Sequence, residues 1–157
     1  MLIQHRFPLF CLDLEGVLWP EIWQSVARST GIEELGMTTQ EVQSYDELMQ
    51  IRLKALKNSQ ITLAQILEII ETMKPLDGAV EFLNELRRLG QVLVISDTFV
   101  EFLEPVLRHL NNPMVFCNAL DLDENGFIRR HIMRSSIGKK GMLAALSSQG
   151  YSIGAAG

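Results

Sequence analysis

Hydrophobic and polar residues follow two patterns along this chain, and these patterns distinguish extended from helical segments. Continuous apolar runs at residues 7–12 and 91–95 predict buried strands of the kind found in parallel sheets. Shorter runs at 114–117 and 151–155 predict two further strands. Apolar residues at helical spacing predict amphipathic helices, with Gly and Pro residues near their ends, at 21–29, 45–57, 63–73, 77–89, 98–110 and 139–149.

A turn signal and one long helical stretch complete the pattern. Asn125-Gly126, between extended segments at 119–122 and 127–133, is typical of a β-hairpin. The alternation of strands and helices predicts an α/β fold, a Rossmann-like doubly wound parallel sheet. Residues 20–73 are too long for one crossover, so we expect a small helical cap inserted after the first strand. Residues 1–19 and 74–157 would then form the core. Within the cap, Thr38 or Thr39 is expected to cap a short helical segment near Glu41.

Composition excludes several classes of function. The chain has 157 residues, 47% of them hydrophobic, which is ample for a packed core. Its net charge is −5 and it has no basic stripe, which argues against a nucleic-acid partner. The two cysteines, Cys11 and Cys117, lie in apolar runs and are expected to be buried thiols. With no signal peptide and no apolar run of about 18 residues, we expect a cytoplasmic protein without a membrane partner.

Polar residues lie just after two of the predicted strands and at the start of one predicted helix, where a ligand can bind. Asp13 and Glu15 follow the first strand, Ser96-Asp97 follows the second, and Lys139 opens the helix after the hairpin, with Lys140 next to it. In doubly wound sheets, ligands bind beyond the carboxyl ends of the strands. These groups are therefore expected to converge on one crevice, although they are distant in the sequence.

This combination of side chains suits phosphoryl transfer from a phosphomonoester. A carboxylate nucleophile divides the hydrolysis into two displacements through an aspartyl-phosphate. A hard cation such as Mg²⁺ bridges the two anions, and a hydroxyl group and a lysine hold the phosphate oxygens. A second acid protonates the leaving alkoxide and later activates water.

The motifs also resemble those of a known family. D-L-E-G-V-L, I-S-D-T-F and the lysine at the helix start are similar to three motifs of the haloacid dehalogenase-like phosphatases. C-L-D-L-E-G-V-L-x-P-E-I-W, Y-D-E-L-M-x-x-R-L, K-P-L-x-G-A-V-E-F and S-D-T-F-x-E-F resemble the phosphoserine phosphatase/homoserine phosphotransferase group more closely. The resemblance runs from about residue 10 to the end of the chain, and it also implies a helical cap.

The resemblance implies a role for each residue that matches a motif. Asp13 would be the nucleophile and Glu15 the general acid and base. The Asp13 carboxylate and the Glu15 backbone carbonyl would bind Mg²⁺. Lys139, rather than Lys140, fits the register of the third motif. Substrate binding would fall to two groups: Ser96 and Asp97 for the phosphate, and Glu21 and Arg52 for the ammonium and carboxylate of an amino acid.

Each of these residues also has an ordinary structural explanation. Ser96 or Asp97 could cap the helix that follows, and Glu21 could favour a helix N-terminus. Lys139 and Arg52 could be solvated surface residues. It is the ordered combination that favours a site.

The implied function is a Mg²⁺-dependent phosphatase of O-phospho-L-serine that can pass phosphate to homoserine. The substrate could instead be another small phosphate ester. A less favoured alternative is that the protein is a receiver-type signalling domain. The family's fourth, acidic motif would follow residues 151–157, where this sequence stops, so we expect a truncated chain that is weakly active or inactive. A fragment that binds phosphate or phosphoserine without turnover, or that forms a homodimer, is the main alternative.

Overall fold

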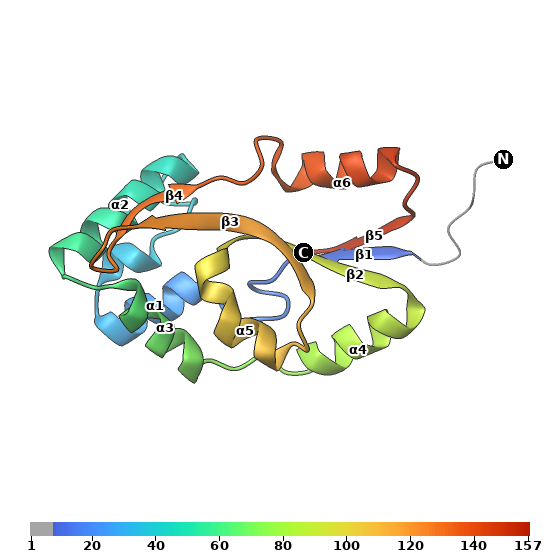
Figure 1. The fold of residues 1–157 in the computed structure, drawn as a ribbon, viewed down its shortest axis with the longest axis horizontal. Helices are drawn as coiled ribbons and strands as arrows, with labels where there is room; N and C mark the ends of the chain where they lie inside the picture. The colour runs from blue at the N-terminus through green and yellow to red at the C-terminus, as the bar shows by residue number, and fades with distance from the viewer. Residues whose placement is uncertain (1–7) are drawn as a thin grey trace.

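The computed structural model describes residues 8–157, which form a five-stranded sheet with helices on both faces (Figure 1). The strand order is β4-β3-β2-β1-β5. Four strands are parallel and the fifth, β4, pairs antiparallel with β3. Their bounds are β1 Leu9–Leu12, β2 Gln91–Phe99, β3 Met114–Leu122, β4 Ile128–Ile132 and β5 Ile153–Ala156. The predicted α/β fold is confirmed, and the start predicted for the first strand, at residue 7, lies outside the described residues.

Helices from the second half of the chain cover the two faces of the sheet. α4 (Ala79–Leu89) and α5 (Leu103–His109) lie on one face, and α6 (Gly138–Ser148) lies on the other (Figure 1). The alternation along β1 explains this sandwich, because successive side chains of a strand point to opposite faces. Leu9 and Cys11 contact the α6 side, whereas Leu12 belongs to the cluster on the α4 and α5 side.

Residues 20–73, which we call the cap segment, are helical as predicted. They form α1 (Ile22–Thr30), the short 3₁₀ helix η1 (Glu33–Gly36), α2 (Tyr45–Asn58) and α3 (Leu63–Thr72). These helices lie beyond the carboxyl end of β1, and α2 packs beside β4 (Figure 1). The helix expected near Thr38 is wrong: residues 39–41 form only a turn, in which Glu41 accepts hydrogen bonds from Thr38.

The largest differences from the prediction lie around β2 and β3. β2 continues to Phe99, four residues beyond its predicted end, because Thr98 and Phe99 are buried against the core. The predicted helix at 98–110 therefore starts later, as the 3₁₀ helix η2 (Val100–Phe102) followed by α5. Pro105 lies in the first turn of α5, where a backbone N–H has no helical partner to lose. β3 is one strand rather than two short ones.

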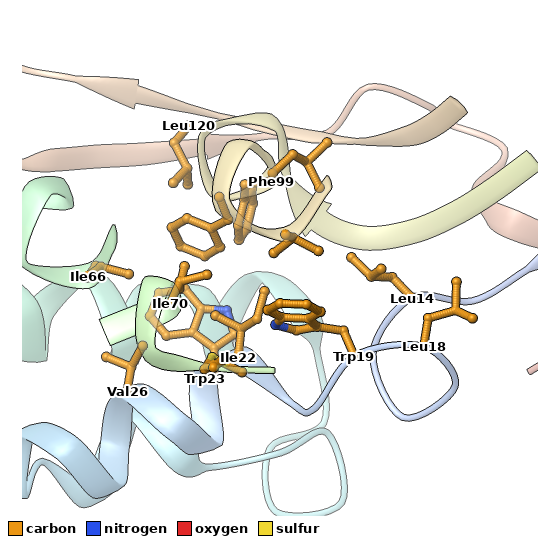
Figure 2. Packing of buried hydrophobic residues seen from close by; sticks show 14 of the residues in the cluster. Leu14, Leu18, Trp19, Ile22, Trp23, Val26, Ile66, Ile70, Phe99 and Leu120 are labelled. Carbon is orange, nitrogen blue, oxygen red and sulfur yellow. The ribbon is translucent and has the colours of Figure 1, made fainter. Parts of the chain in front are cut away.

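The main hydrophobic cluster joins the sheet to the cap segment. Trp19, Phe99 and Phe102 are fully buried, with the Phe99 and Phe102 ring centroids 5.5 Å apart. Figure 2 shows apolar side chains of α1 and α3 around them, including Val26 and Ile70. Leu14 and Leu18 belong to the same cluster. This packing fixes the turn after β1, which carries the two acids of the candidate site.

Candidate active site

Asp13 lies at the carboxyl end of β1, where its backbone N–H donates to the carbonyl of Ala156 in β5 (3.1 Å). One carboxylate oxygen, Oδ1, accepts from the N–H of Leu14 (2.8 Å). The other, Oδ2, accepts from Lys139 Nζ (2.7 Å). The side chain is 28% exposed, so it is held in place and still reachable from solvent. Those are the properties that a carboxylate nucleophile requires.

Lys139 lies in the first turn of α6 and connects two carboxylates. Its Nζ lies 2.7 Å from Asp13 Oδ2 and 3.3 Å from Asp97 Oδ2. Burial alone would lower the pKa of Lys139, but the carboxylates of Asp13 and Asp97 outweigh burial and hold this pKa above its ordinary value. Lys139 therefore carries a positive charge at neutral pH, beside the predicted nucleophile. Lys140 is exposed.

Glu15 is held by the turn that follows Asp13. Gly16 supplies the positive φ of this turn, +77°, and its N–H donates to the carbonyl of Trp19 (2.8 Å). The Glu15 carboxylate accepts from the N–H of Ile22 (2.9 Å), at the start of α1. Burial raises the pKa of Glu15 to about 7, and the nearby Glu21 adds to the rise, while the Ile22 N–H opposes it. A carboxyl group with such a pKa can both give and take a proton near neutral pH.

Ser96 and Asp97 lie in β2 where its pairing with β3 becomes irregular, between Ile95 and Phe99. Ser96 is buried, and its hydroxyl accepts from the N–H of Thr98 (3.2 Å). Neither Ser96 nor Asp97 caps the next helix, because β2 runs on to Phe99 before η2 begins. The capping explanation is therefore wrong for both residues.

Arg52 of α2 is buried instead of solvated, so the surface explanation is wrong for it. Its Nε donates to the carbonyl of Leu35 (3.2 Å) and its Nη2 to that of Met37 (2.7 Å). The guanidinium lies 4.9 Å from the ring centroid of Trp23, a cation–π contact. Burial lowers the pKa of Arg52, but an arginine stays charged in proteins. These contacts fix a cation within the cap segment.

All seven predicted site residues line one cleft of about 440 Å³ between the sheet and the cap segment. They are Asp13, Glu15, Glu21, Arg52, Ser96, Asp97 and Lys139. Glu21 is exposed and stands at the N-cap of α1 without a side-chain capping bond. Its position satisfies the helix-terminus explanation and lines the cleft at the same time.

Two polar residues that hold the Asp97 backbone carbonyl were not predicted from the sequence. Tyr45 lines the cleft, and its hydroxyl donates to the backbone carbonyl of Asp97 (3.2 Å). Asn118 in β3 is buried and donates to the same carbonyl (3.2 Å). A signal for Tyr45 exists, because it precedes Arg52 by two helical turns and so lies on the same face of α2. Asn118 lies in an apolar run and carries no such signal.

The donors available to Mg²⁺ are few. The Asp13 carboxylate and the Glu15 backbone carbonyl are hard oxygen donors of the kind that Mg²⁺ prefers. Within residues 8–157, however, no group of three or more His, Cys, Asp or Glu side chains is placed to hold a metal ion. The Asp13 carboxylate and the Glu15 carbonyl would supply part of a cation's coordination shell, and water and substrate oxygens would have to supply the rest. Along the same residues, no helix is both long and apolar enough to span a membrane.

Two curated proteins are similar in sequence to this chain. Phosphoserine phosphatase ThrH of Pseudomonas aeruginosa is 44% identical over 147 residues, which are 94% of this chain and 72% of that protein. A phosphoserine phosphatase of Pseudomonas syringae pv. tomato is 46% identical over 147 residues, which are 94% of this chain but only 62% of the relative.

A solved structure and a family profile extend the comparison. The structure is a phospho-aspartyl intermediate analogue of phosphoserine phosphatase, with a TM-score of 0.78 and 20% sequence identity. The match covers 96% of this chain and 78% of the chain in that structure, and it supports the fold. The profile of the haloacid dehalogenase-like hydrolases matches residues 7–146. With motifs, fold and cleft in agreement, this chain belongs to the haloacid dehalogenase-like hydrolase family.

Proposed function

We propose that this protein is a phosphatase of O-phospho-L-serine that works through an aspartyl-phosphate on Asp13. The observation that carries the proposal is the position of the Asp13 carboxylate, which directly follows β1, lines the cleft and lies 2.7 Å from the Lys139 ammonium. The names of the two relatives supply the substrate class.

The first step would form a bond between an Asp13 carboxylate oxygen and phosphorus, while the bond from phosphorus to the serine side-chain oxygen breaks. Protonated Glu15 would give its proton to the departing alkoxide. In the second step, Glu15 would take a proton from water as the water oxygen bonds to phosphorus, which frees Asp13. With homoserine in place of water, the same step would transfer the phosphate. The pKa of Glu15, about 7, supports both roles.

The other residues of the cleft would bind and neutralise the substrate. The Lys139 ammonium would offset the negative charge of the phosphate and of Asp13, and Ser96 would donate a hydrogen bond to a phosphate oxygen. Arg52 would face the substrate carboxylate and Glu21 its ammonium. Mg²⁺, when bound by the Asp13 carboxylate and the Glu15 carbonyl, would reduce the repulsion between nucleophile and phosphate.

Trapping the covalent intermediate tests this proposal. Phosphoserine labelled at phosphorus is mixed with the protein, the reaction is stopped in acid, and the labelled peptide is identified by mass spectrometry. We expect the label on Asp13 and its loss in Asp13→Asn, because an amide is a poor nucleophile. Asp77→Asn, which changes an exposed acid outside the cleft, serves as the matched control and should label normally. Label on any residue other than Asp13 would contradict the proposal.

A second candidate is a phosphoserine-binding protein with little turnover. The observation that favours it is the scarcity of metal donors within residues 8–157. Binding of phosphoserine to the cleft, measured by calorimetry, without release of phosphate, would select this candidate.

A further inference from the structure

The peptide unit between Asp97 and Thr98 is fixed from both sides by side chains. Its carbonyl accepts from Tyr45 Oη and from Asn118 Nδ2, each at 3.2 Å. Its N–H donates to Ser96 Oγ at 3.2 Å. This peptide lies where the pairing of β2 with β3 is interrupted, so the sheet ladder does not determine its orientation. The side chains of Tyr45, Asn118 and Ser96 fix its orientation instead.

The three side chains come from different parts of the fold. Ser96 and Asn118 belong to strands of the sheet, whereas Tyr45 is the first residue of α2 in the cap segment. The Tyr45 ring stands edge-on to the His131 ring of β4, with centroids 5.7 Å apart and an interplanar angle of 84°. His131 Nε2 in turn lies 2.9 Å from Asp46 Oδ1. Tyr45 is thus held at a contact between the cap segment and the hairpin.

The Tyr45 hydroxyl is suited to act as a donor. Burial raises the pKa of Tyr45 well above its ordinary value, and the charge of Asp97 adds to the rise. The phenol therefore keeps its proton at every pH at which the protein would work. A phenolate could not donate to the Asp97 carbonyl.

A short series of contacts connects Tyr45 to Asp13, the predicted nucleophile. Tyr45 holds the backbone of Asp97, the side chain of Asp97 contacts Lys139 Nζ at 3.3 Å, and Lys139 contacts Asp13 at 2.7 Å. We infer that Tyr45 is a positioning residue, by which the cap segment sets the orientation of the Asp97–Thr98 peptide when α2 lies over the cleft. The inference rests on the proposed function, because it assigns this peptide to the phosphate end of the same cleft.

A simpler role for Tyr45 would be direct contact between its hydroxyl and the substrate. The two roles differ in which substrates they affect. A hydroxyl contact with the amino-acid part would change KM for phosphoserine and leave a small aryl phosphate unaffected. Positioning of the Asp97 peptide would lower kcat for both substrates, because both place phosphorus at the same point.

The substitution Tyr45→Phe isolates the hydroxyl, since the ring and its packing on His131 remain. Tyr151→Phe removes the other tyrosine hydroxyl of the chain, outside the catalytic cleft, and is the matched control. For Tyr45→Phe, we expect kcat to fall about 3- to 10-fold for both phosphoserine and para-nitrophenyl phosphate, with KM changed less than about 2-fold. Hydrogen–deuterium exchange should also become faster at the Thr98 amide in Tyr45→Phe, and not in Tyr151→Phe.

The exchange measurement separates failure of this inference from failure of the proposed function. Unchanged exchange at the Thr98 amide in Tyr45→Phe overturns the positioning role, whatever the activity. A rise in KM for phosphoserine alone, with kcat intact, overturns it in favour of a direct contact between the Tyr45 hydroxyl and the substrate. Faster exchange in a protein that forms no aspartyl-phosphate supports the positioning of the peptide and contradicts the proposed chemistry.

Discussion

Glu15 shows how a single residue acquires chemistry from its surroundings. It follows a buried strand in a turn closed by Gly16, so its carboxyl group is drawn out of water yet still lines the cleft. Burial raises its pKa from 4.5 to about 7. The same burial disfavours the charged form of Glu15, so ionisation of this carboxyl group lowers the stability of the fold at neutral pH.

The sign of that cost follows from proton linkage. Between pH 4.5 and 7 the folded protein holds the Glu15 proton more tightly than the unfolded chain does. The free energy of unfolding therefore falls as the pH rises through this window. Glu15→Gln removes the charge, and we expect it to be more stable than the unaltered protein by about 2 to 3 kcal/mol at pH 8 and by less than about 1 kcal/mol at pH 5.

Urea unfolding at the two pH values measures this difference. Glu124→Gln, an exposed glutamate in the hairpin turn, is the control and should track the unaltered protein. A stability gain of Glu15→Gln that is equal at pH 5 and pH 8 would contradict the raised pKa. Phosphatase activity should be lost in Glu15→Gln and kept in Glu124→Gln, because an amide at position 15 cannot exchange the proton.

Residue-level prediction succeeded where a sequence rule exists. Asp13, Ser96 and Lys139 were placed together because they follow strands or open a helix at one edge of a parallel sheet. Arg52 was selected by a motif, but its burial depends on carbonyls of η1 and its flanking turn, which no spacing rule brings near α2. Asn118 was missed because a single amide in a strand looks the same whether it serves a site or faces solvent.

At the level of elements, α2 carries three residues of the cleft on one face, namely Tyr45, Leu48 and Arg52. Tyr45 is its first residue and Arg52 lies two turns on, so the start of this helix sets where both side chains point. Ser44 caps it, accepting at Oγ from the N–H of Glu47 (3.1 Å). The cap satisfies one of the free N–H groups of the first turn.

Ser44→Ala removes the cap and should cost about 1 kcal/mol of unfolding free energy, because the Glu47 N–H loses its side-chain partner. Chemical denaturation measures this loss. Ser44→Asp restores an acceptor at the same position and should recover most of the stability. Equal destabilisation by Ala and Asp would show that the Ser44 cap does not stabilise α2.

Element boundaries were predicted well where Gly or a hairpin signal marks them. Gly31 ends α1 in the left-handed conformation, with φ of +72°, and Gly126 closes the predicted hairpin with φ of +82°. β2 was predicted four residues too short because Ser96-Asp97 reads as loop-forming in sequence. Its continuation is set by the burial of Phe99 among the aromatic rings of the core, a tertiary effect that local propensity does not contain.

At the scale of the molecule, the fold gathers all seven predicted site residues, and within residues 8–157 no group of three or more His, Cys, Asp or Glu side chains is placed to hold a metal ion. We expect this 157-residue chain to hydrolyse phosphoserine on the order of 100-fold more slowly than the Pseudomonas aeruginosa relative measured in parallel, because we expect the described donors to hold Mg²⁺ weakly and loss of groups around a metal costs up to about 100-fold in affinity or activity. A phosphate-release assay across a Mg²⁺ titration checks this. Asp13→Asn sets the background, and turnover that matches the relative would refute the expectation.

The placement of the cap segment has a consequence for how the polypeptide reaches its native state. β1 and β2 are neighbours in the sheet, yet residues 13–90 separate them along the chain. Joining these strands requires closing a long loop, whose entropic cost must be met before their pairing stabilises anything. Contacts of high sequence separation slow folding, while α1, α2 and α3 can form from local interactions. We therefore expect the helices to form early in folding and the strand pair that positions Asp13 to assemble late.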